Sequence, residues 1–316
     1  MDETDVILSS LLLVNSRTPY RELAEKLNLS ANAVHKRIQS LIDAGIIRKF
    51  TTKISLMALQ AIIVILHGKS EAESVSNLHE KLCKNRSIWW VTLGGGNYMA
   101  IGAYVKSMAE IESLVDYVKK EAVMPNPTIG IFPTQPNPVS SDIDKTLRPL
   151  DREIIYALRN DSRKSVADIA EEVRVTAKTV RRRLSAMINK GLVEFSIHWY
   201  PDASNDICTT MQIRLKPTVD KNAASNTLKK YFPNLLTCFQ FVNIPNELFC
   251  VVWTKTMKEL KEFQQILTNE DMIASVVSNI LYTGYIFDTW RDDLVLPERM
   301  VIEENKNPKT MSSLST

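Results

Sequence analysis

The sequence is poor in the features that mark secreted, membrane-spanning and metal-binding proteins. It has 4 cysteines and 4 histidines among 316 residues, and neither a C-x-x-C pair nor metal-ligand spacing connects them, so we expect no disulfide framework and no metal site. The longest apolar run, ALQAIIVIL at 58–66, is far shorter than the roughly 18 residues of a membrane span. The acidic start, MDETD, lacks the pattern of a signal peptide. The sequence therefore predicts a soluble, cytoplasmic protein without a membrane partner.

An excess of charge of one sign is also missing. Lys and Arg number 39 against 36 Asp and Glu, a net charge of +3, so any contact with nucleic acid must come from a local basic cluster. No Ser/His/Asp pattern, phosphate loop or paired acidic motif stands out, and we expect neither catalytic residues nor a cofactor. The glycine cluster GGGN at 94–97 lacks the third glycine of G-x-G-x-x-G, and a predicted strand follows it, which excludes the dinucleotide-binding reading.

What the sequence does contain is an internal repeat. At a fixed offset of 146, residues 5–50 align without gaps on residues 151–196. Eleven pairs are identical: Asp5/Asp151, Leu12/Leu158, Ser16/Ser162, Arg17/Arg163, Ala24/Ala170, Glu25/Glu171, Ala31/Ala177, Val34/Val180, Arg37/Arg183, Ile42/Ile188 and Gly45/Gly191. The repeat continues with KSMAEIESL at 106–114 against KTMKELKEF at 255–263. A period of about 147 residues is too long for a solenoid, so one unit is used twice.

Each unit begins with a pattern typical of a winged helix-turn-helix. Two helical segments, 4–15 and 150–161, are followed by a second helix that starts at Thr18–Pro19 or after Ser165. After a three-residue turn, Ser30 or Thr176 caps a third helix, which ends at Gly45 or Gly191. The alternating segments IIRKFTTKI and LVEFSIHWY are consistent with a wing in each unit.

The remainder of each unit alternates strands and helices. In the first unit we expect strands at 59–67, 87–93, 98–105 and 128–132, with helices at 71–83 and 107–121. In the second unit we expect strands at 207–215, 236–242, 247–254 and 276–286, with helices at 220–231 and 256–268. The order βαββαβ predicts a ferredoxin-like sandwich, so the fold class is α+β with two tandem copies of a winged helix-turn-helix plus a sandwich.

The expected domain boundaries follow from these segments and from the proline-rich seam FPTQPNPVSSDIDKTLRPL at 132–150. They are a first winged helix-turn-helix at 1–55, a first sandwich for sensing or pairing at 56–134, a linker at 135–148, a second winged helix-turn-helix at 149–202, a second sandwich at 203–294, and a polar, disordered tail at 295–316.

This combination resembles the Lrp/AsnC, or feast/famine, family of prokaryotic transcription regulators. The motifs that carry the resemblance are LDREIIYALRNDSRKSVADIAEEVRVTAKTVRRRLSAMINKGLV and WWVTLGGGNYMAIGAYV. The resemblance implies binding of double-stranded DNA by the first domain, and pairing and small-molecule sensing, for instance of an amino acid, by the RAM-like second domain. It also implies a place at the nucleoid. The duplication within one chain departs from the common single-unit pattern and implies an intrachain pseudo-dimer, with a higher homo-oligomer as an open alternative.

The third helix of the second unit is the strongest candidate for DNA contact. Six Lys or Arg and no acid lie between Arg174 and Lys190, and at about 100° per residue Arg182 points away from the apolar face. A solvated charged face is the alternative, but such faces usually mix both signs. The candidate DNA-binding residues are Asn32, His35, Lys36, Arg37 and Ser40 in the first unit, and Lys178, Thr179, Arg181, Arg182, Arg183 and Asn189 in the second.

In the family that the sequence resembles, the loop between the second and third sandwich strands lies near an effector pocket. The resemblance therefore makes Gly94, Gly95, Gly96 and Asn97 candidate effector-binding residues. The second unit has NIPN at 243–246 in this place, so its site is expected to be altered or lost. Two alternative functions stay open at this point: a siroheme-decarboxylase-like enzyme of the same fold, and a chromatin-organising protein with little sequence preference.

Overall fold

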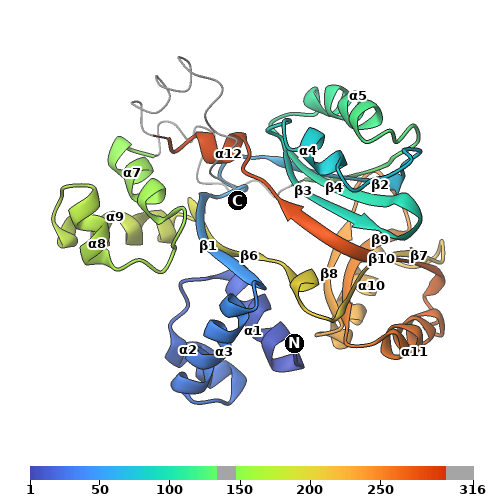
Figure 1. Cartoon of the computed structure of the whole chain (residues 1–316), viewed down its shortest axis with the longest axis horizontal. Helices are drawn as coiled ribbons and strands as arrows, with labels where there is room; N and C mark the ends of the chain where they lie inside the picture. Colours follow the sequence, from blue (N-terminus) through green and yellow to red (C-terminus); the bar gives the residue numbers. More distant parts are fainter. Residues whose placement is uncertain (134–146, 297–316) are drawn as a thin grey trace.

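The computed structural model describes residues 1–133 and 147–296 (Figure 1). The elements of the first unit are α1 (Glu3–Val14), α2 (Tyr20–Leu27), α3 (Ala31–Asp43), β1 (Ile47–Ile54), β2 (Ile62–Lys69), α4 (Leu78–Leu82), β3 (Ile88–Gly94), η1 (Gly95–Asn97), β4 (Tyr98–Val105), α5 (Glu110–Glu121) and β5 (Thr128–Pro133). Those of the second are α7 (Pro149–Leu158), α8 (Val166–Glu172), α9 (Ala177–Asn189), β6 (Val193–Trp199), η2 (Pro201–Ala203), β7 (Ile207–Leu215), α10 (Lys221–Leu228), η3 (Lys229–Tyr231), β8 (Leu235–Gln240), β9 (Glu247–Thr254), α11 (Met257–Thr268), β10 (Ile273–Ile286) and α12 (Trp290–Asp293). No helix in the described ranges is long and apolar enough to cross a membrane.

The predicted α+β fold class is confirmed by the sheet topology. One eight-stranded sheet has the order β5-β2-β4-β3-β10-β7-β9-β8. Each half of this sheet, β5-β2-β4-β3 or β10-β7-β9-β8, places the fourth strand of a βαββαβ unit at one side and the second at the other, which is the ferredoxin-like order. Helices α4 and α5 belong to the first half, and α10 and α11 to the second.

The two halves of the sheet are joined at both sides. The long strand β10 pairs with β7 of its own unit and then with β3 of the other unit. At the opposite side, the Val242 amide donates to the Ile131 carbonyl (2.9 Å), and the Asn243 side chain bonds both the amide of Ile131 and the carbonyl of Ile129. Between the halves, Phe241 and Phe249 are fully buried. The sandwich domains of the two units therefore fold as one body.

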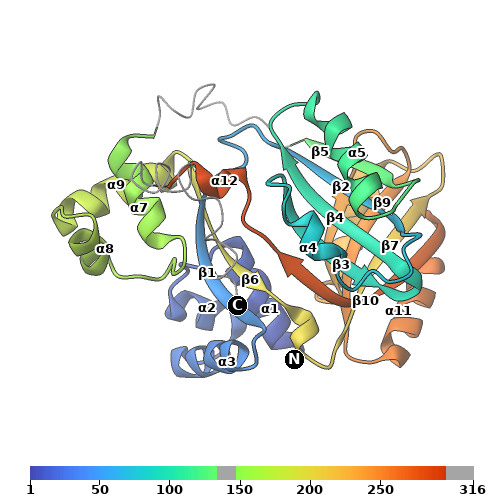
Figure 2. The ribbon, with the colours of Figure 1, turned by 45° about the horizontal axis from the view of Figure 1, so that its top comes forward.

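The expected wing of each unit is corrected by the structure. Each unit supplies a single strand, and β1 and β6 pair with each other antiparallel, with Phe50 opposite Ile197. We call this two-stranded sheet the ribbon. Ile197 completes the core of the first helix-turn-helix, and Ile54 completes that of the second. Figures 1 and 2 show the ribbon between the two helical domains and the eight-stranded sheet. The helical domains are thus interlocked through exchanged strands.

Residues that are identical in the two repeats meet where the units face each other. The hydroxyls of Ser16 and Ser162 are hydrogen-bonded at 2.6 Å and both residues are fully buried. The Arg163 guanidinium donates to the carbonyl of Ser16 (2.6 Å), and the Arg17 guanidinium donates to the carbonyl of Ser162. In a homodimer, identical residues meet in this way beside the two-fold axis, so the chain is arranged as a pseudo-dimer.

Several predicted boundaries shift in the structure. Helix α2 begins at Tyr20 with Pro19 as its N-cap, one residue later than expected, and α4 spans only Leu78–Leu82 of the expected helix at 71–83. Val295, which the sequence analysis placed in the tail, is 5% exposed and packs into the core of the second helix-turn-helix. Of the predicted linker, residues up to 146 lie outside the described residues, as does the tail beyond 296.

The buried His67 gives the fold a pH dependence. It lies on β2 with 2% exposure, its ring is 4.9 Å from that of Phe249, and its Nε2 has no partner among the described residues. Burial lowers the pKa of His67 from 6.5 to about 4. Because the folded state disfavours the charged ring, its contribution to stability is complete above pH 6.5 and is lost as the pH falls towards 4.

We expect His67→Leu to remove this part of the pH dependence. When the pH falls from 7.5 to 5.0, His67 takes up a proton in the unfolded chain but stays uncharged in the folded chain. The free energy of unfolding of the wild-type chain therefore falls by about 2 kcal/mol. Urea unfolding at both pH values measures this loss, and the variant should lose about 2 kcal/mol less than the wild type over the same interval. An equal loss in both chains would show that His67 does not titrate below its ordinary pKa.

Candidate DNA-binding surface

The two third helices, α3 and α9, are held by local sequence features at both ends. The hydroxyl of Ser30 accepts from the Ala33 amide (3.1 Å), and that of Thr176 accepts from the Thr179 amide (3.2 Å), so both predicted N-caps are confirmed. Just beyond the helices, Gly45 and Gly191 have φ of 71° and 62°, a region that favours glycine. Each helix therefore starts and stops at the predicted place.

One face of each helix is buried in its own domain. Helix α9 buries Val180, Leu184 and Met187, and α3 buries the equivalent residues Val34, Ile38 and Leu41. At the next position of the same face, Ile188 and Ile42 are 47% and 37% exposed. These two isoleucines lie at the edge of the apolar face, because only about three residues in every two turns of such a helix are buried.

Most of the predicted DNA-binding residues lie on the exposed face of these helices. Asn32, His35, Lys36 and Ser40 of α3 and Lys178, Arg181, Arg182 and Asn189 of α9 are exposed. Thr179 is half-buried, and its hydroxyl is hydrogen-bonded to that of Thr176 (3.0 Å). The His35 ring packs edge-on against the ring of Tyr20 at 5.3 Å. The exposed faces differ in charge, since α9 offers three cations there and α3 offers Lys36.

Arg37 and Arg183 have a different environment from the other basic residues. Arg183 forms a bidentate pair with Asp151 of α7, whose side chain is fully buried, with Nε to Oδ1 at 2.7 Å. Arg37 binds Asp2 (2.8 Å) and Asp5 (2.7 Å) at the start of α1. These carboxylates raise the pKa of both guanidinium groups. Both residues tie the third helix to the first helix of their unit, and their predicted contact with DNA stays a prediction.

The glycine turn between β3 and β4 packs tightly against neighbouring segments. A Cβ at Gly94 would lie 2.7 Å from the Ile280 carbonyl oxygen of β10, and Gly96 has a φ of 65°. The Asn97 side-chain amide donates to the Ala72 carbonyl (2.7 Å). Close approach of the β10 backbone explains Gly94, and the positive φ explains Gly96. The predicted effector role of Gly94, Gly95, Gly96 and Asn97 stays a prediction.

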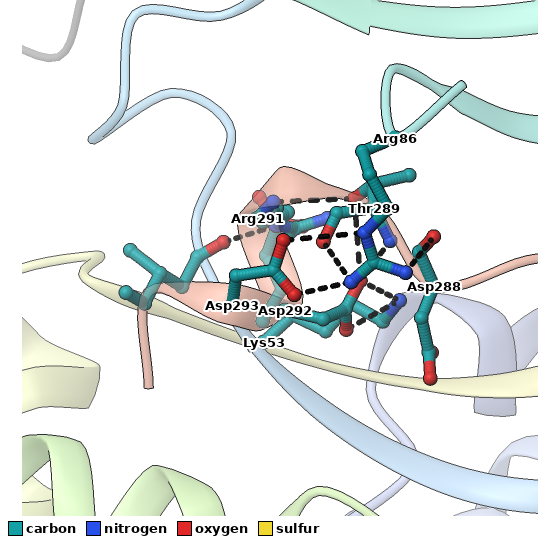
Figure 3. Close-up of polar contacts among 9 residues, drawn as sticks. Lys53, Arg86, Asp288, Thr289, Arg291, Asp292 and Asp293 are labelled. Atoms are coloured by element: carbon teal, nitrogen blue, oxygen red, sulfur yellow. Dashed lines mark hydrogen bonds and ion pairs between the residues drawn. The ribbon is translucent and has the colours of Figure 1, made fainter. Parts of the chain in front are cut away.

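Sequence reasoning missed a polar junction between the ribbon and the sheet. As Figure 3 shows, α12 lies at its centre: Arg291 donates to the Ile54 carbonyl and pairs with Glu194, while Lys53 pairs with Asp292 (2.8 Å). Arg86, just before β3, pairs with Asp293 and donates to the Asp288 carbonyl (3.0 Å). The motif WRDD at 290–293 carries these charges, but it has no periodicity that would reveal their partners.

Sequence comparison connects this architecture with known DNA-binding proteins. The family described as winged helix-turn-helix DNA-binding matches residues 1–48 and again residues 147–194. The HTH-type transcriptional regulator LrpA of Pyrococcus horikoshii is 33% identical over 100 residues, covering 31% of this chain and 71% of LrpA. The HTH-type transcriptional regulator LysM of Sulfurisphaera tokodaii is 39% identical over 98 residues, covering 31% of this chain and 69% of LysM.

The chain belongs to the Lrp/AsnC family of transcription regulators. As a member of this family it is a DNA-binding regulator, and its DNA-binding part is the helix-turn-helix that both repeats contain. The relatives match about a third of the chain each, as expected for a duplicated member.

The whole chain also has a structural counterpart. The siroheme decarboxylase NirDL has a TM-score of 0.57 with 12% sequence identity, and the likeness covers 96% of this chain and 100% of NirDL. At this identity the likeness concerns the fold alone.

Proposed function

We propose that the chain is a sequence-specific transcription regulator whose two helix-turn-helix modules bind unequal halves of one DNA site. The observation that carries the proposal is the exposed face of α9, where Lys178, Arg181 and Arg182 project without an acidic neighbour on the helix. A helix in the major groove contacts base edges with its central residues and phosphates with its flanks. Arg182, Lys178 and Asn189 are the candidates for base contact, and Arg181 is a flanking candidate for phosphate contact.

The first module offers a different set of contacts. Its outward residues are Asn32, Lys36 and Ser40, and asparagine favours adenine whereas lysine and arginine favour guanine. Two helices related by a pseudo-two-fold axis fit half-sites about one helical turn, roughly 34–36 Å, apart. The preferred site is therefore an imperfect palindrome whose stronger half binds α9. Selection from random DNA tests this, and a perfect palindrome bound by a dimer of chains would contradict it.

The affinity for DNA should fall steeply with salt. Each phosphate neutralised by Lys or Arg releases counterions, so log Kd should rise with log salt concentration with a slope of about one per phosphate contact. We expect a slope of several in fluorescence anisotropy titrations between 50 and 300 mM salt. A slope near zero would exclude the exposed face of α9 as an electrostatic contact. A slope that is equal for selected and random DNA, with equal affinities, would favour the chromatin-organising alternative.

We propose that regulation, rather than catalysis, is the activity of the chain, and that it takes place in the cytoplasm. A small-molecule effector and a higher homo-oligomer are compatible with this function, and the solution mass tests the second. The likeness of the whole fold to NirDL makes a decarboxylase the competing candidate. An absorption spectrum of the purified chain, alone and after addition of haem, separates the two: a stable Soret band at one tetrapyrrole per chain would favour the enzyme.

A further inference from the structure

A cavity of about 700 Å³ lies between the ribbon and the eight-stranded sheet. Thr51 of β1 and His198 of β6 line one side, and Trp90 of β3 and Leu281 of β10 line the other. Neither the proposed DNA-binding residues nor the glycine turn at 94–97 contributes to it. Its volume is within the range of roughly 300–1,000 Å³ that is typical of small-molecule sites.

The wall of the cavity is rich in aromatic rings. The ring of Trp89 is stacked on Tyr104 (5.3 Å between centroids, 4° between planes) and on Trp90 (5.7 Å, 22°). The aromatic residues of the wall are Trp89, Trp90, Trp199, Tyr104, Tyr200, Phe232, Phe239 and Phe287. Broad ring surfaces of this kind bind flat, aromatic molecules by stacking. Phe232, which is 42% exposed, leaves part of this surface open to solvent.

The cationic side chains of the wall are already paired with acids. Lys53 pairs with Asp292 and Arg291 pairs with Glu194, while the Asp202 carboxylate accepts from the Thr283 hydroxyl (2.9 Å) and the Gly284 amide (3.2 Å). Burial, with the nearby Lys53 and Lys49, lowers the pKa of His198 to about 3, so its ring is uncharged at neutral pH. An anionic ligand would lose its hydration without gaining a free cation, and a cationic ligand would meet Asp202, whose carboxylate already accepts two hydrogen bonds.

We propose that this cavity is an effector site for an uncharged, flat aromatic molecule. The proposal rests on the proposed function, because the effector acts on DNA binding. The ligand would contact the ribbon, which completes the cores of both helix-turn-helix domains, and the sheet, which joins the two units. The polar junction of Lys53, Glu194 and Arg291 borders the same cavity. Occupancy therefore biases the placement of α3 and α9, and DNA must change ligand affinity by the same factor.

Two dyes with related fused rings test the ligand class. Nile red is flat and uncharged, and cresyl violet is flat and cationic. We expect Nile red to bind the full-length chain in a 1:1 ratio in fluorescence titrations, at least tenfold more tightly than cresyl violet. Ser196→Trp, which places an indole in the wall, should weaken Nile red binding at least tenfold, as should Trp90→Leu, which removes a ring. Ser113→Trp on the exposed face of α5 is the matched control and should leave binding unchanged.

The coupling between ligand binding and DNA binding is tested with DNA fragments that the chain has selected from random DNA. Saturating Nile red should change the affinity for DNA at least fivefold, and DNA should change the affinity for Nile red by the same factor. The proposal is overturned if Nile red does not bind, if Ser196→Trp and Trp90→Leu chains with wild-type melting behaviour bind it normally, or if the DNA affinity stays constant. If the chain binds no DNA without dye, the proposed function fails and the regulatory role with it, whereas the titrations still decide the ligand class.

Discussion

Removing the three exposed cations of α9 should abolish specific DNA binding. We expect Lys178→Ala, Arg181→Ala and Arg182→Ala together to cost at least about 3 kcal/mol, a loss of more than about a hundredfold in affinity. The salt slope should fall by up to about three, because each lost cation neutralises at most about one phosphate. Fluorescence anisotropy on the selected site, with the folded state checked by circular dichroism, measures both quantities.

The matched control carries the same change of net charge in the same unit. Lys255→Ala, Lys258→Ala and Lys261→Ala remove three exposed lysines, one just before α11 and two in its first half. If this control loses as much affinity as the α9 variant, net charge alone governs binding and α9 has no special role. Arg182→Ala alone should relax the base preference at one position, whereas Arg181→Ala should weaken binding to all sequences alike.

Arg183 is left out of this set because its loss has a different consequence. Asp151 is fully buried and pairs with Arg183, so Arg183→Ala leaves an unpaired buried carboxylate at a cost of about 3 kcal/mol of stability. Lys36→Ala in the first unit should weaken DNA binding only moderately, since α3 contributes less charge than α9.

The helices and the sandwich topology could be predicted from sequence because their determinants are local. Caps such as Ser30 and Thr176, and glycines such as Gly191, act within a few residues of the helix ends that they define. The same pattern of helices and strands also occurs in both units, so each element could be predicted from two segments. Boundaries were least secure where propensity was weak, as in the expected helix at 71–83, of which only Leu78–Leu82 is helical.

The ribbon could not be predicted, because pairing of β1 with β6 joins segments about 146 residues apart in sequence. An alternating strand has the same pattern whether it pairs within a hairpin or with another unit. The arginine ion pairs also depend on tertiary contact. A signal for them was present: Asp5/Asp151 and Arg37/Arg183 are identical in both repeats, whereas the exposed Lys36 and Arg182 between them differ. At these positions, identity between the repeats accompanies the ion pair, and divergence accompanies the exposed surface.

Substitution of Gly130 should destabilise the whole chain, because it opens the closure between the two units. A Cβ at Gly130 on β5 would lie 2.3 Å from the ring of Phe241, a fully buried residue just after β8. The ring of Phe241 packs beside that of Phe249, with 6.1 Å between their centroids. Gly130→Ala therefore forces Phe241 out of its position, at a cost of about 1–3 kcal/mol of unfolding free energy.

The control is another glycine in a strand of the same sheet. A Cβ at Gly284 on β10 would have its nearest neighbour at 3.4 Å, an ordinary contact, so Gly284→Ala should change stability by less than about 1 kcal/mol. Phe241→Ala, which leaves a cavity, should cost about 3–5 kcal/mol. In the double variant the clash disappears with the ring, so Gly130→Ala should add little to Phe241→Ala. Urea unfolding of the four chains measures this coupling, and strictly additive losses would show that Gly130 and Phe241 do not form the closure together.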